Sequence, residues 1–382
     1  MEPKIKVTML IASLGLSGTP RIMMDIIENI NRDRFEVSVA CKPEYPDFED
    51  DLLIPLKELG IRTLPLRGEP LFSVKGISDL YNHVKKDSID IIHCWDALGI
   101  ATRIMRWSAN VRVVESFGNP VTSKGSFLYY WVNKMTSAFL DGAIFASEGV
   151  EKSYLQSDVW VLKRRIKTRV IHNSIDSAGL SKKYYPKDRI RRKWQISGGD
   201  FLLTNAGVFN EQKAQSELLR ALKILSNHCP NTKLILIGWG PKEEELKSSV
   251  IDINLQNNVL FTGKLSHEEV YEVLSITDVF VLSSLWEGFG LVIGEAMAMG
   301  KPVVATRTDG SELLVVDRAT GFLVPPRDPV AMSNAIQVLI NNRDLCHRMG
   351  ESGQKRIATL CHPDRFIREH EEFYMDILGR DH

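Results

Sequence analysis

The sequence predicts an α/β protein with two domains, each built on a mainly parallel β-sheet. Its 382 residues exceed what one ordinary hydrophobic core organises. Short β-branched runs alternate with amphipathic helical segments along the chain. Because strands separated by a helix cannot form a hairpin, neighbouring strands should run parallel, with right-handed crossovers that place helices on both faces of the sheet.

The first half of the chain carries six short runs that we interpret as strands. Their β-branched and apolar residues are typical of parallel strands that are buried on both faces. Amphipathic segments between several of them, such as 21–29 and 77–85, predict helices. The expected strands are 7–12, 35–40, 89–93, 111–115, 143–146 and 169–172.

The second half repeats this plan, which indicates a second domain of the same kind. A polar, Lys/Arg-rich stretch at 173–193 separates the halves, so we predict an N-terminal domain of residues 1–172 and a C-terminal domain of residues 173–361. A last helix, at about 362–382, is expected to pack back on the N-terminal domain. Expected strands are 201–206, 233–237, 259–262, 279–283, 302–306 and 321–324, and expected helices are 216–226, 243–249, 267–274, 290–299 and 329–341.

Composition and charge narrow the function classes. Lys+Arg and Asp+Glu balance at 48 each, so no global field recruits nucleic acid. The five cysteines lack metal-ligand or disulfide spacing, which favours the reducing cytoplasm. The first apolar run, at 7–12, is too short for a membrane span or a cleaved signal. We therefore expect a cytoplasmic globular protein.

The most informative segment is 278–295, where a strand, a Gly-containing loop and a helix follow one another. The amides at 289–291 are expected at the N-terminus of that helix, where unpaired donors and the helix dipole attract an anion. Glu287 in the loop and Glu295 in the helix can each accept hydrogen bonds from a vicinal diol. Phosphate-binding amides flanked by two carboxylates describe a sugar nucleotide better than a simple phosphate. The alternative is that both glutamates are solvated surface charges.

The pattern Glu287-x7-Glu295, with Phe289-Gly290 inside it, resembles the donor motif of family 4 glycosyltransferases, which have the GT-B fold. Other segments follow the family's pattern in the same order along nearly the whole chain. They are 170–176, 207–213, 238–241, 261–265, 300–306 and 321–324. The resemblance implies two Rossmann-like domains whose parallel sheets face each other across a cleft.

The resemblance also implies roles for individual residues. Lys213 would neutralise the donor diphosphate and stabilise the leaving group as negative charge develops. Glu287 would hold the sugar, Glu295 the ribose hydroxyls, and Gly18 would lie against the phosphates. The alternative for Lys213 is an exposed loop lysine. With Lys213 and Glu287 as catalytic candidates, the donor site would comprise Gly18, Gly207, Lys213, Gly263, Leu265, Glu287, Phe289, Gly290, Leu291 and Glu295.

The chain departs from the family's pattern at two positions. Val208 stands where the family usually has an Arg, which removes one phosphate cation. Phe117 stands nearest to where the family usually has a His after the fourth strand. On the acceptor side we therefore keep His93, Phe117 and Asn119 as candidates, and His93 is as compatible with a packed histidine as with a catalytic one.

The expected reaction follows from these residues. No Asp-x-Asp occurs in the chain, so the usual carboxylate clamp for a metal-bound nucleotide is missing, and we expect neither a metal nor another cofactor. The resemblance implies a hexosyltransferase that retains the anomeric configuration. We assign Glu287 to positioning, and the working mechanism is front-face attack by the acceptor hydroxyl. The expected acceptor is a glycan or a lipid-linked sugar, in polysaccharide, glycolipid or glycoconjugate synthesis.

Two further features bear on the acceptor. The stretch between positions 161 and 193 contains twelve Lys or Arg residues and only two acidic residues, Asp176 and Asp188. This tract is compatible with peripheral contact with anionic lipids at the inner membrane face, although a solvated linker is the favoured interpretation. The aromatic run 127–131 suits an acceptor groove, a membrane interface or a core.

Three other function classes share features with this sequence. A Rossmann dehydrogenase is disfavoured because the first turn, around Gly15 and Gly18, lacks the three-glycine fingerprint. A nucleotide-sugar epimerase shares the two-domain fold and stays open. A catalytically weak sugar-nucleotide-binding or scaffold subunit also stays open, because of Val208 and Phe117. The sequence leaves the nucleotide base, the sugar, the acceptor and the oligomeric state undetermined.

Overall fold

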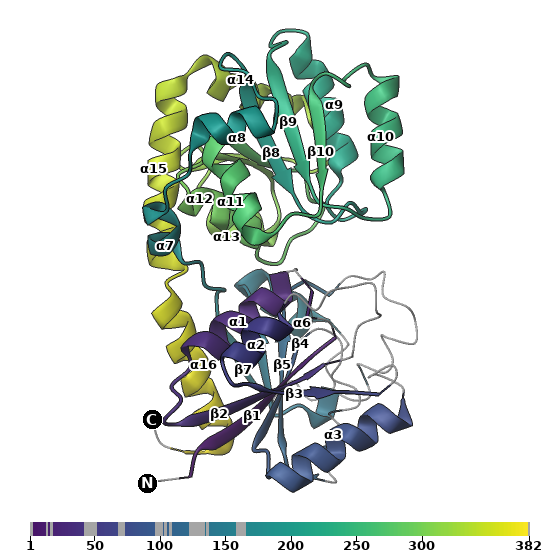
Figure 1. Cartoon of the computed structure of the whole chain (residues 1–382), viewed down its shortest axis with the longest axis vertical. Helices are drawn as coiled ribbons and strands as arrows, with labels where there is room; N and C mark the ends of the chain where they lie inside the picture. Colours follow the sequence, from purple (N-terminus) through teal and green to yellow (C-terminus); the bar gives the residue numbers. More distant parts are fainter. Residues whose placement is uncertain are drawn as a thin grey trace. The chain divides into compact units, whose positions relative to one another are not determined.

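A computed structural model of the chain describes residues 3–12, 14–15, 18–41, 52–67, 73–95, 102, 105–106, 109–121, 134, 137–157 and 166–380. The chain divides into two compact units (Figure 1). Unit 1 comprises Met1–Ser174 and Pro363–His382, and unit 2 comprises Ile175–His362. The division after Ser174 lies two residues from the predicted boundary, and the last helix belongs to unit 1.

Unit 1 is built on a seven-stranded parallel sheet in the order β3-β2-β1-β4-β5-β6-β7. Its strands are β1 (Ile5–Ile11), β2 (Phe35–Cys41), β3 (Arg62–Pro65), β4 (Ile91–Trp95), β5 (Arg112–Phe117), β6 (Gly142–Phe145) and β7 (Lys167–Val170). Its helices are α1 (Gly18–Asn29), α2 (Leu53–Glu58), α3 (Val74–Asp87), α6 (Glu148–Gln156) and α16 (Pro363–Leu378), with a 3-10 turn at Ser137–Phe139.

Helix α16 is bound tightly to the sheet of unit 1. Phe373 and Tyr374 are almost fully buried on its inner face. A Cβ atom at Gly142 in β6 would lie 2.9 Å from the Phe373 ring, so only glycine allows the helix this close. Arg169 of β7 adds an ion pair of 2.6 Å to Asp376. The chain's last helix is therefore an integral part of the N-terminal unit.

Unit 2 is built on a six-stranded parallel sheet in the order β10-β9-β8-β11-β12-β13. Its strands are β8 (Phe201–Ala206), β9 (Thr232–Ile237), β10 (Val259–Gly263), β11 (Val279–Leu282), β12 (Val303–Thr306) and β13 (Gly321–Val324). Its helices are α7 (Ser177–Lys182), α8 (Lys187–Lys193), α9 (Gln215–Ser226), α10 (Glu243–Asp252), α11 (His267–Ile276), α12 (Leu291–Ala298), α13 (Asp309–Leu314), α14 (Pro329–Asn341) and α15 (Arg343–Leu360).

Each sheet reverses its strand order at one point. In unit 1 the reversal lies between β1 and β4, and in unit 2 it lies between β8 and β11. Open parallel sheets bind ligands outside the carboxyl ends of their strands at such a switch point. In unit 2, a ligand site is therefore expected at the loops that follow β8 and β11. In unit 1, it is expected at the loops that follow β1 and β4.

The predicted fold class, α/β with two Rossmann-like domains, is confirmed. The expected linker at 173–193 is wrong, because this stretch contains α7 and α8 and is tied to α11 by ion pairs. Lys183 pairs with Glu268 at 2.6 Å, and Lys193 pairs with Glu272 at 3.2 Å. The basic residues at 163–165 and the aromatic run 127–131 lie outside the described residues. None of the helices within the described ranges is long and apolar enough to cross a bilayer.

Candidate functional site

The loop between β11 and α12 leads into the first amides of the helix. Gly290 is the N-cap of α12 and has a φ of 84°, a left-handed conformation that glycine adopts without strain. No side chain caps this end. The first amides of a helix have no acceptor within the helix, and the helix dipole makes this end positive. The N-terminus of α12, beginning at Leu291, therefore has no side-chain cap and is suited to an anion.

The loop after β8 places a lysine at the same edge of the sheet. The backbone amide of Lys213 donates to the side-chain carbonyl of Asn210 at 3.0 Å, and its carbonyl accepts from Ser283 Oγ at 2.8 Å. The Leu285 amide also donates to the Gln212 carbonyl at 2.7 Å. These bonds join the loops that follow β8 and β11, which are the two strands of the switch point.

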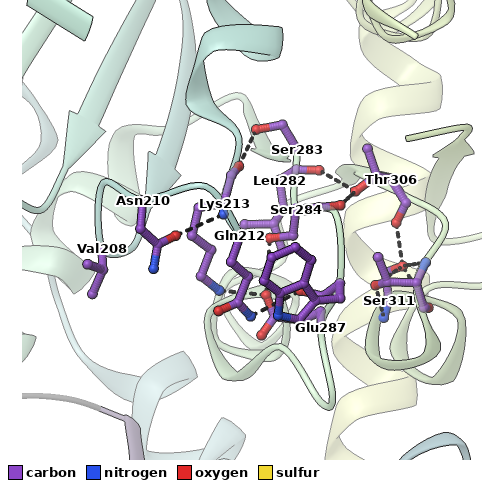
Figure 2. Close-up of polar contacts among 12 residues, drawn as sticks. Val208, Asn210, Gln212, Lys213, Leu282, Ser283, Ser284, Glu287, Thr306 and Ser311 are labelled. Carbon is purple, nitrogen blue, oxygen red and sulfur yellow. Dashed lines mark hydrogen bonds and ion pairs between the residues drawn. The ribbon is translucent and has the colours of Figure 1, made fainter. Parts of the chain in front are cut away.

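The two catalytic candidates form an ion pair (Figure 2). Lys213 Nζ lies 2.5 Å from Glu287 Oε2, and the two side chains are only 15% and 10% exposed. Ser284 Oγ donates to the same carboxylate oxygen at 3.1 Å. The alternative of solvated surface charges is therefore wrong for Lys213 and Glu287. A carboxylate and an ammonium group are held together beside the amides of α12.

Hydrogen bonds from buried hydroxyl groups support the loop between β11 and α12 (Figure 2). Thr306 Oγ1 donates to the Ser284 carbonyl at 2.5 Å, and Ser311 Oγ donates to the Thr306 carbonyl at 2.5 Å. All three side chains are nearly fully buried. Satisfied buried networks of this kind restrict the loop to one conformation. Sequence reasoning did not identify these residues, because isolated Ser and Thr residues carry no motif of their own.

Gly310, at the start of α13, provides a second support. Its amide donates to the Glu287 carbonyl at 2.8 Å. A Cβ atom at Gly310 would lie 2.7 Å from backbone atoms of Phe289, which is closer than real contacts allow. Phe289 itself is 3% exposed. The backbone from Glu287 to Phe289 is thus packed directly on α13, and only glycine fits at position 310.

The other donor-site candidates lie along the same edge of unit 2. Glu295 is half-buried in α12 and accepts a hydrogen bond of 3.1 Å from the Tyr271 hydroxyl. Gly263 ends β10 with a φ of 70°, and its carbonyl accepts from the Gly238 amide at 3.0 Å. Leu265 follows in a half-buried position, and Gly207 follows β8 with a φ of 153°. Gly207, Gly263 and Leu265 therefore lie at the carboxyl ends of strands, while Glu295 lies within α12.

The candidates in unit 1 have different environments. Gly18 is exposed as the first residue of α1, and Asn119 is exposed after β5. His93 is 0% exposed, and its two ring nitrogens bond Tyr374 Oη and Ser116 Oγ at 2.7 Å each. We therefore assign His93 to packing instead of acceptor contact. Phe117 is 8% exposed, with its ring centroid 4.4 Å from that of Tyr154.

The described part of the chain contains no group of three or more His, Cys, Asp or Glu side chains arranged to hold a metal ion. Lys213 and the amides of α12 are positive groups that could meet an anionic ligand at the β8/β11 edge. Val208 is 41% exposed beside this loop and brings no charge to it.

Two family models match the chain in succession. Residues 16–178 match the model described as Glycosyltransferase Family 4, and residues 186–356 match the one described as Glycosyl transferases group 1. Among curated relatives, the UDP-Gal:alpha-D-GlcNAc-diphosphoundecaprenol alpha-1,3-galactosyltransferase of Escherichia coli is 24% identical over 98% of both chains. The putative glycosyltransferase EpsD of Bacillus subtilis is 26% identical over 84% of this chain and 85% of its own length.

Solved structures share the fold over nearly the whole chain. Anabaena HepE, in complex with UDP-glucose, matches with a TM-score of 0.86 and 21% identity, covering 97% of this chain and all of its own. A sucrose-phosphate synthase from Thermosynechococcus elongatus matches with a TM-score of 0.83 and 22% identity, covering 98% of this chain and 100% of its own. Both family models, which fall on the two α/β units in turn, agree with this shared architecture. The chain therefore belongs to glycosyltransferase family 4 and is a transferase of the GT-B fold.

Proposed function

We propose that the protein transfers a sugar from a nucleotide-diphosphate donor to an acceptor hydroxyl, with retention at the anomeric carbon and without a metal ion. The observation that carries this proposal is the buried Lys213–Glu287 pair beside the N-terminus of α12. Its position at the β8/β11 switch point is where an α/β sheet binds nucleotides.

The ion pair supplies both groups that a sugar diphosphate needs. When the diphosphate binds at the α12 amides, Lys213 Nζ turns from Glu287 to the phosphate oxygens as a point charge. The carboxylate of Glu287 is then free to accept hydrogen bonds from the sugar hydroxyls, while Ser284 keeps it oriented. When the ion pair opens, Lys213 thus binds the phosphate end of the sugar–phosphate linkage and Glu287 binds the sugar end.

The same groups favour departure of the nucleoside diphosphate. Negative charge grows on the leaving phosphate as the bond to the anomeric carbon breaks, and fixed donors at that point stabilise the transition state. We assign Glu287 to positioning, because Ser284 holds its Oε2 atom and the carboxylate accepts hydrogen bonds from the sugar hydroxyls. Attack by the acceptor on the face that the diphosphate leaves accounts for retention without an enzyme nucleophile.

The names of similar proteins suggest the donor and acceptor classes. The Escherichia coli relative is named for UDP-galactose and a diphosphoundecaprenol acceptor, and the Anabaena structures contain UDP or UDP-glucose. We therefore propose a UDP-hexose donor and a glycan or lipid-linked acceptor. Glu295, held by Tyr271, would bind the ribose diol, and Gly263 with Leu265 would border the base.

A thermal-shift screen tests the donor assignment. The protein is heated with UDP, GDP, ADP, UDP-glucose and UDP-galactose, each with magnesium or with EDTA. Ligands that bind only the folded state raise Tm by mass action. We expect UDP compounds to raise Tm equally in both media, and NMR of the product should show the donor's anomeric configuration. A shift that needs magnesium, or an inverted product, would contradict the proposal.

A catalytically weak binding subunit is the second candidate, favoured by Val208 at the phosphate side and Phe117 at the acceptor side. It predicts the same UDP shift without any sugar transfer. An epimerase would instead convert the UDP-hexose when no acceptor is present. Analysis of the sugar nucleotide after incubation alone, and then with an acceptor, separates these activities from transfer.

Peripheral membrane contact would suit a lipid-linked acceptor. Tyr184 is 88% exposed between α7 and α8, and the exposed basic residues Lys182, Lys187 and Arg189 lie near it in the sequence. Basic residues near an anionic bilayer contribute about 1 kcal/mol each. We expect sedimentation with phosphatidylglycerol vesicles and none with phosphatidylcholine vesicles. Equal behaviour with both would remove membrane contact from the proposal.

A further inference from the structure

A cavity in unit 2 is formed by four loops at the carboxyl edge of the sheet. Its volume is about 150 Å³. Residues of the loop that follows β8 and of the first turn of α9 form one wall. Lys242 after β9, Leu285 after β11 and Arg327 after β13 complete it. None of the proposed donor-site residues lines this cavity within the part of unit 2 that the structure describes, so it is separate from the donor site.

The charged side chains of the wall balance one another. Two are cationic, Lys242 and Arg327, and two are anionic, Glu211 and Glu217. The cavity therefore attracts neither an anion nor a cation by net charge. Arg327 is exposed, and its guanidinium makes no hydrogen bond or ion pair with any described residue. Its five N–H groups are available to a ligand.

Two uncharged side chains add hydrogen-bonding groups that a ligand can reach. The side-chain oxygen of Asn210 accepts from the Lys213 amide at 3.0 Å, which leaves its Nδ2 amide group pointing away from that bond (Figure 2). Neither Asn210 Nδ2 nor Ser216 Oγ has a partner among the described residues. Neither atom is among the unpartnered polar atoms that are sealed from solvent. Both are therefore open to a ligand from solution.

Two residues of the wall have a strained backbone. Ala214 has a φ of 46° and Arg327 a φ of 59°, and both line this cavity. The left-handed region is disfavoured for residues that carry a Cβ atom. Strain of this kind is retained where the surrounding structure enforces it, and it is common in ligand-binding segments. The shape of the wall is therefore held against the local preference of its own backbone.

The chemistry of the wall selects a neutral ligand with several hydroxyl groups. Such a hydroxyl can donate to Glu211 or Glu217 and accept from Asn210 or Arg327. A phosphate or carboxylate would meet the two carboxylates, and an ammonium group would meet the two cations. Only a polyhydroxylated ligand gives every one of these side chains a suitable partner.

The size of the cavity fits one sugar ring. A cavity of about 150 Å³ is large enough for one six-membered ring. Glu211 and Arg327 are exposed, so substituents of the ring can extend into solvent. Ala214, Leu246 and Leu285 also line the cavity and can contact the C–H groups of the ring.

We propose that this cavity binds one hexose ring of a glycan, at a site separate from the donor site. The choice of a glycan as its source rests on the proposed function, in which a glycan is the acceptor. Asn210 links the two sites, because its oxygen holds the Lys213 amide while its Nδ2 donates to the bound sugar. A glycan held here stays on the unit that binds the donor, which raises its effective concentration.

Two substitutions remove single groups from the wall. Arg327→Ala removes a guanidinium that has no partner among the described residues, so the fold should not depend on it. Asn210→Asp keeps an acceptor for the Lys213 amide and removes the Nδ2 donor. The matched control is Arg318→Ala, because Arg318 is also exposed, has a φ of 64° and lies outside this cavity. Melting curves first establish that each variant is folded.

Saturation-transfer NMR measures sugar binding while UDP occupies the donor site. The probes are methyl glucoside, methyl galactoside, methyl N-acetylglucosaminide, cellobiose and lactose. We expect at least one probe to bind the wild type and Arg318→Ala equally, and to bind Arg327→Ala and Asn210→Asp about tenfold more weakly. If the probes bind only when UDP is absent, they occupy the donor site and the proposal is overturned.

Further probes test the ligand class and its source. Methyl phosphate and methylammonium should not bind, and binding of either that is lost in Arg327→Ala would overturn the neutral ligand. A disaccharide should bind more tightly than the methyl glycoside of its sugar, because a glycan extends beyond one ring. Equal affinities would overturn the glycan as the source and leave a free hexose.

Failure of this inference and failure of the proposed function give different results. If no sugar binds the folded wild type, or if Arg327→Ala binds as tightly as the wild type, the sugar site is overturned and the UDP thermal shift is unaffected. Failure of UDP to raise Tm would instead contradict the proposed function, whether or not the sugars bind.

Discussion

Lys213 Nζ lies 2.5 Å from Glu287 Oε2, although the two residues are 74 positions apart. The contact joins the loops that follow β8 and β11 across the switch point of unit 2. A donor diphosphate would compete with Glu287 for Lys213. The ion pair therefore holds both side chains at the proposed donor site in the free protein. Its stability and its catalytic role are therefore separable by mutation.

A double-mutant cycle on this pair is the first prediction. Lys213→Met should lower kcat about 100-fold and raise the donor KM, since it removes a charge that faces the leaving group. It should also lower the free energy of unfolding by about 2 kcal/mol, because it leaves a mostly buried carboxylate without its counter-ion. Lys213→Met/Glu287→Gln should recover most of that stability and none of the activity. Equal stability losses in the single and double variants would contradict the ion pair.

Val208→Arg is expected to strengthen donor binding. Val208 is 41% exposed in the Lys213 loop, so a longer side chain can be accommodated there. A second cation near the diphosphate should lower the donor KM about tenfold, and the gain should shrink with added salt. Val208→Met is the control for side-chain size. If Met and Arg have the same effect, the missing charge is not what limits donor binding.

Gly310→Ala should disturb the site without touching a ligand. The new Cβ would lie 2.7 Å from the Phe289 backbone, so the segment that leads into α12 must shift. We expect a loss of at least tenfold in kcat/KM and a lower Tm, because a displacement of even 1 Å can cost about 100-fold in rate. Gly199→Ala is the matched control, since its Cβ would meet nothing within 4 Å. Equal activities of the two variants would show that the α13 contact does not position the loop.

The sequence predicted well what depends on local pattern. Alternating strands and helices, the Gly290 helix start and the Glu287-x7-Glu295 spacing are all visible within short windows, and the structure places them at one sheet edge. Parallel topology also followed from the pattern, because strands joined by helices have few other arrangements.

What the sequence could not predict depends on distant contacts. Nothing local marks Gly310 as a residue that packs on Phe289, or Thr306 as a donor to Ser284. His93 could be read as a catalytic residue or as a packed one until its contact with Tyr374, 281 positions away, was known. The α7 and α8 segments were mistaken for a linker because Lys183 and Lys193 pair with glutamates of α11, which lies far along the chain.

The buried histidines of unit 1 predict a loss of stability in mild acid. Burial holds the pKa of His370 at about 4, below its ordinary value of 6.5, and burial also lowers the pKa of His93. Between pH 6.5 and about 4, His370 binds a proton in the unfolded chain but not in the folded chain. The free energy of unfolding therefore decreases as the pH falls. For His370 alone the loss, complete near pH 4, is on the order of 3 kcal/mol.

Urea unfolding at a series of pH values between 7 and 4 checks this prediction. His370→Asn should have a flatter profile than the wild type, because the residue that takes up the proton on unfolding is gone. His347→Asn is the matched control: its side chain is 75% exposed on α15, so the wild-type profile should persist. A wild-type slope that survives in His370→Asn would assign the acid sensitivity to other groups, with His93 as the next to replace, since its ring is also fully buried and its pKa is lowered by the same cause.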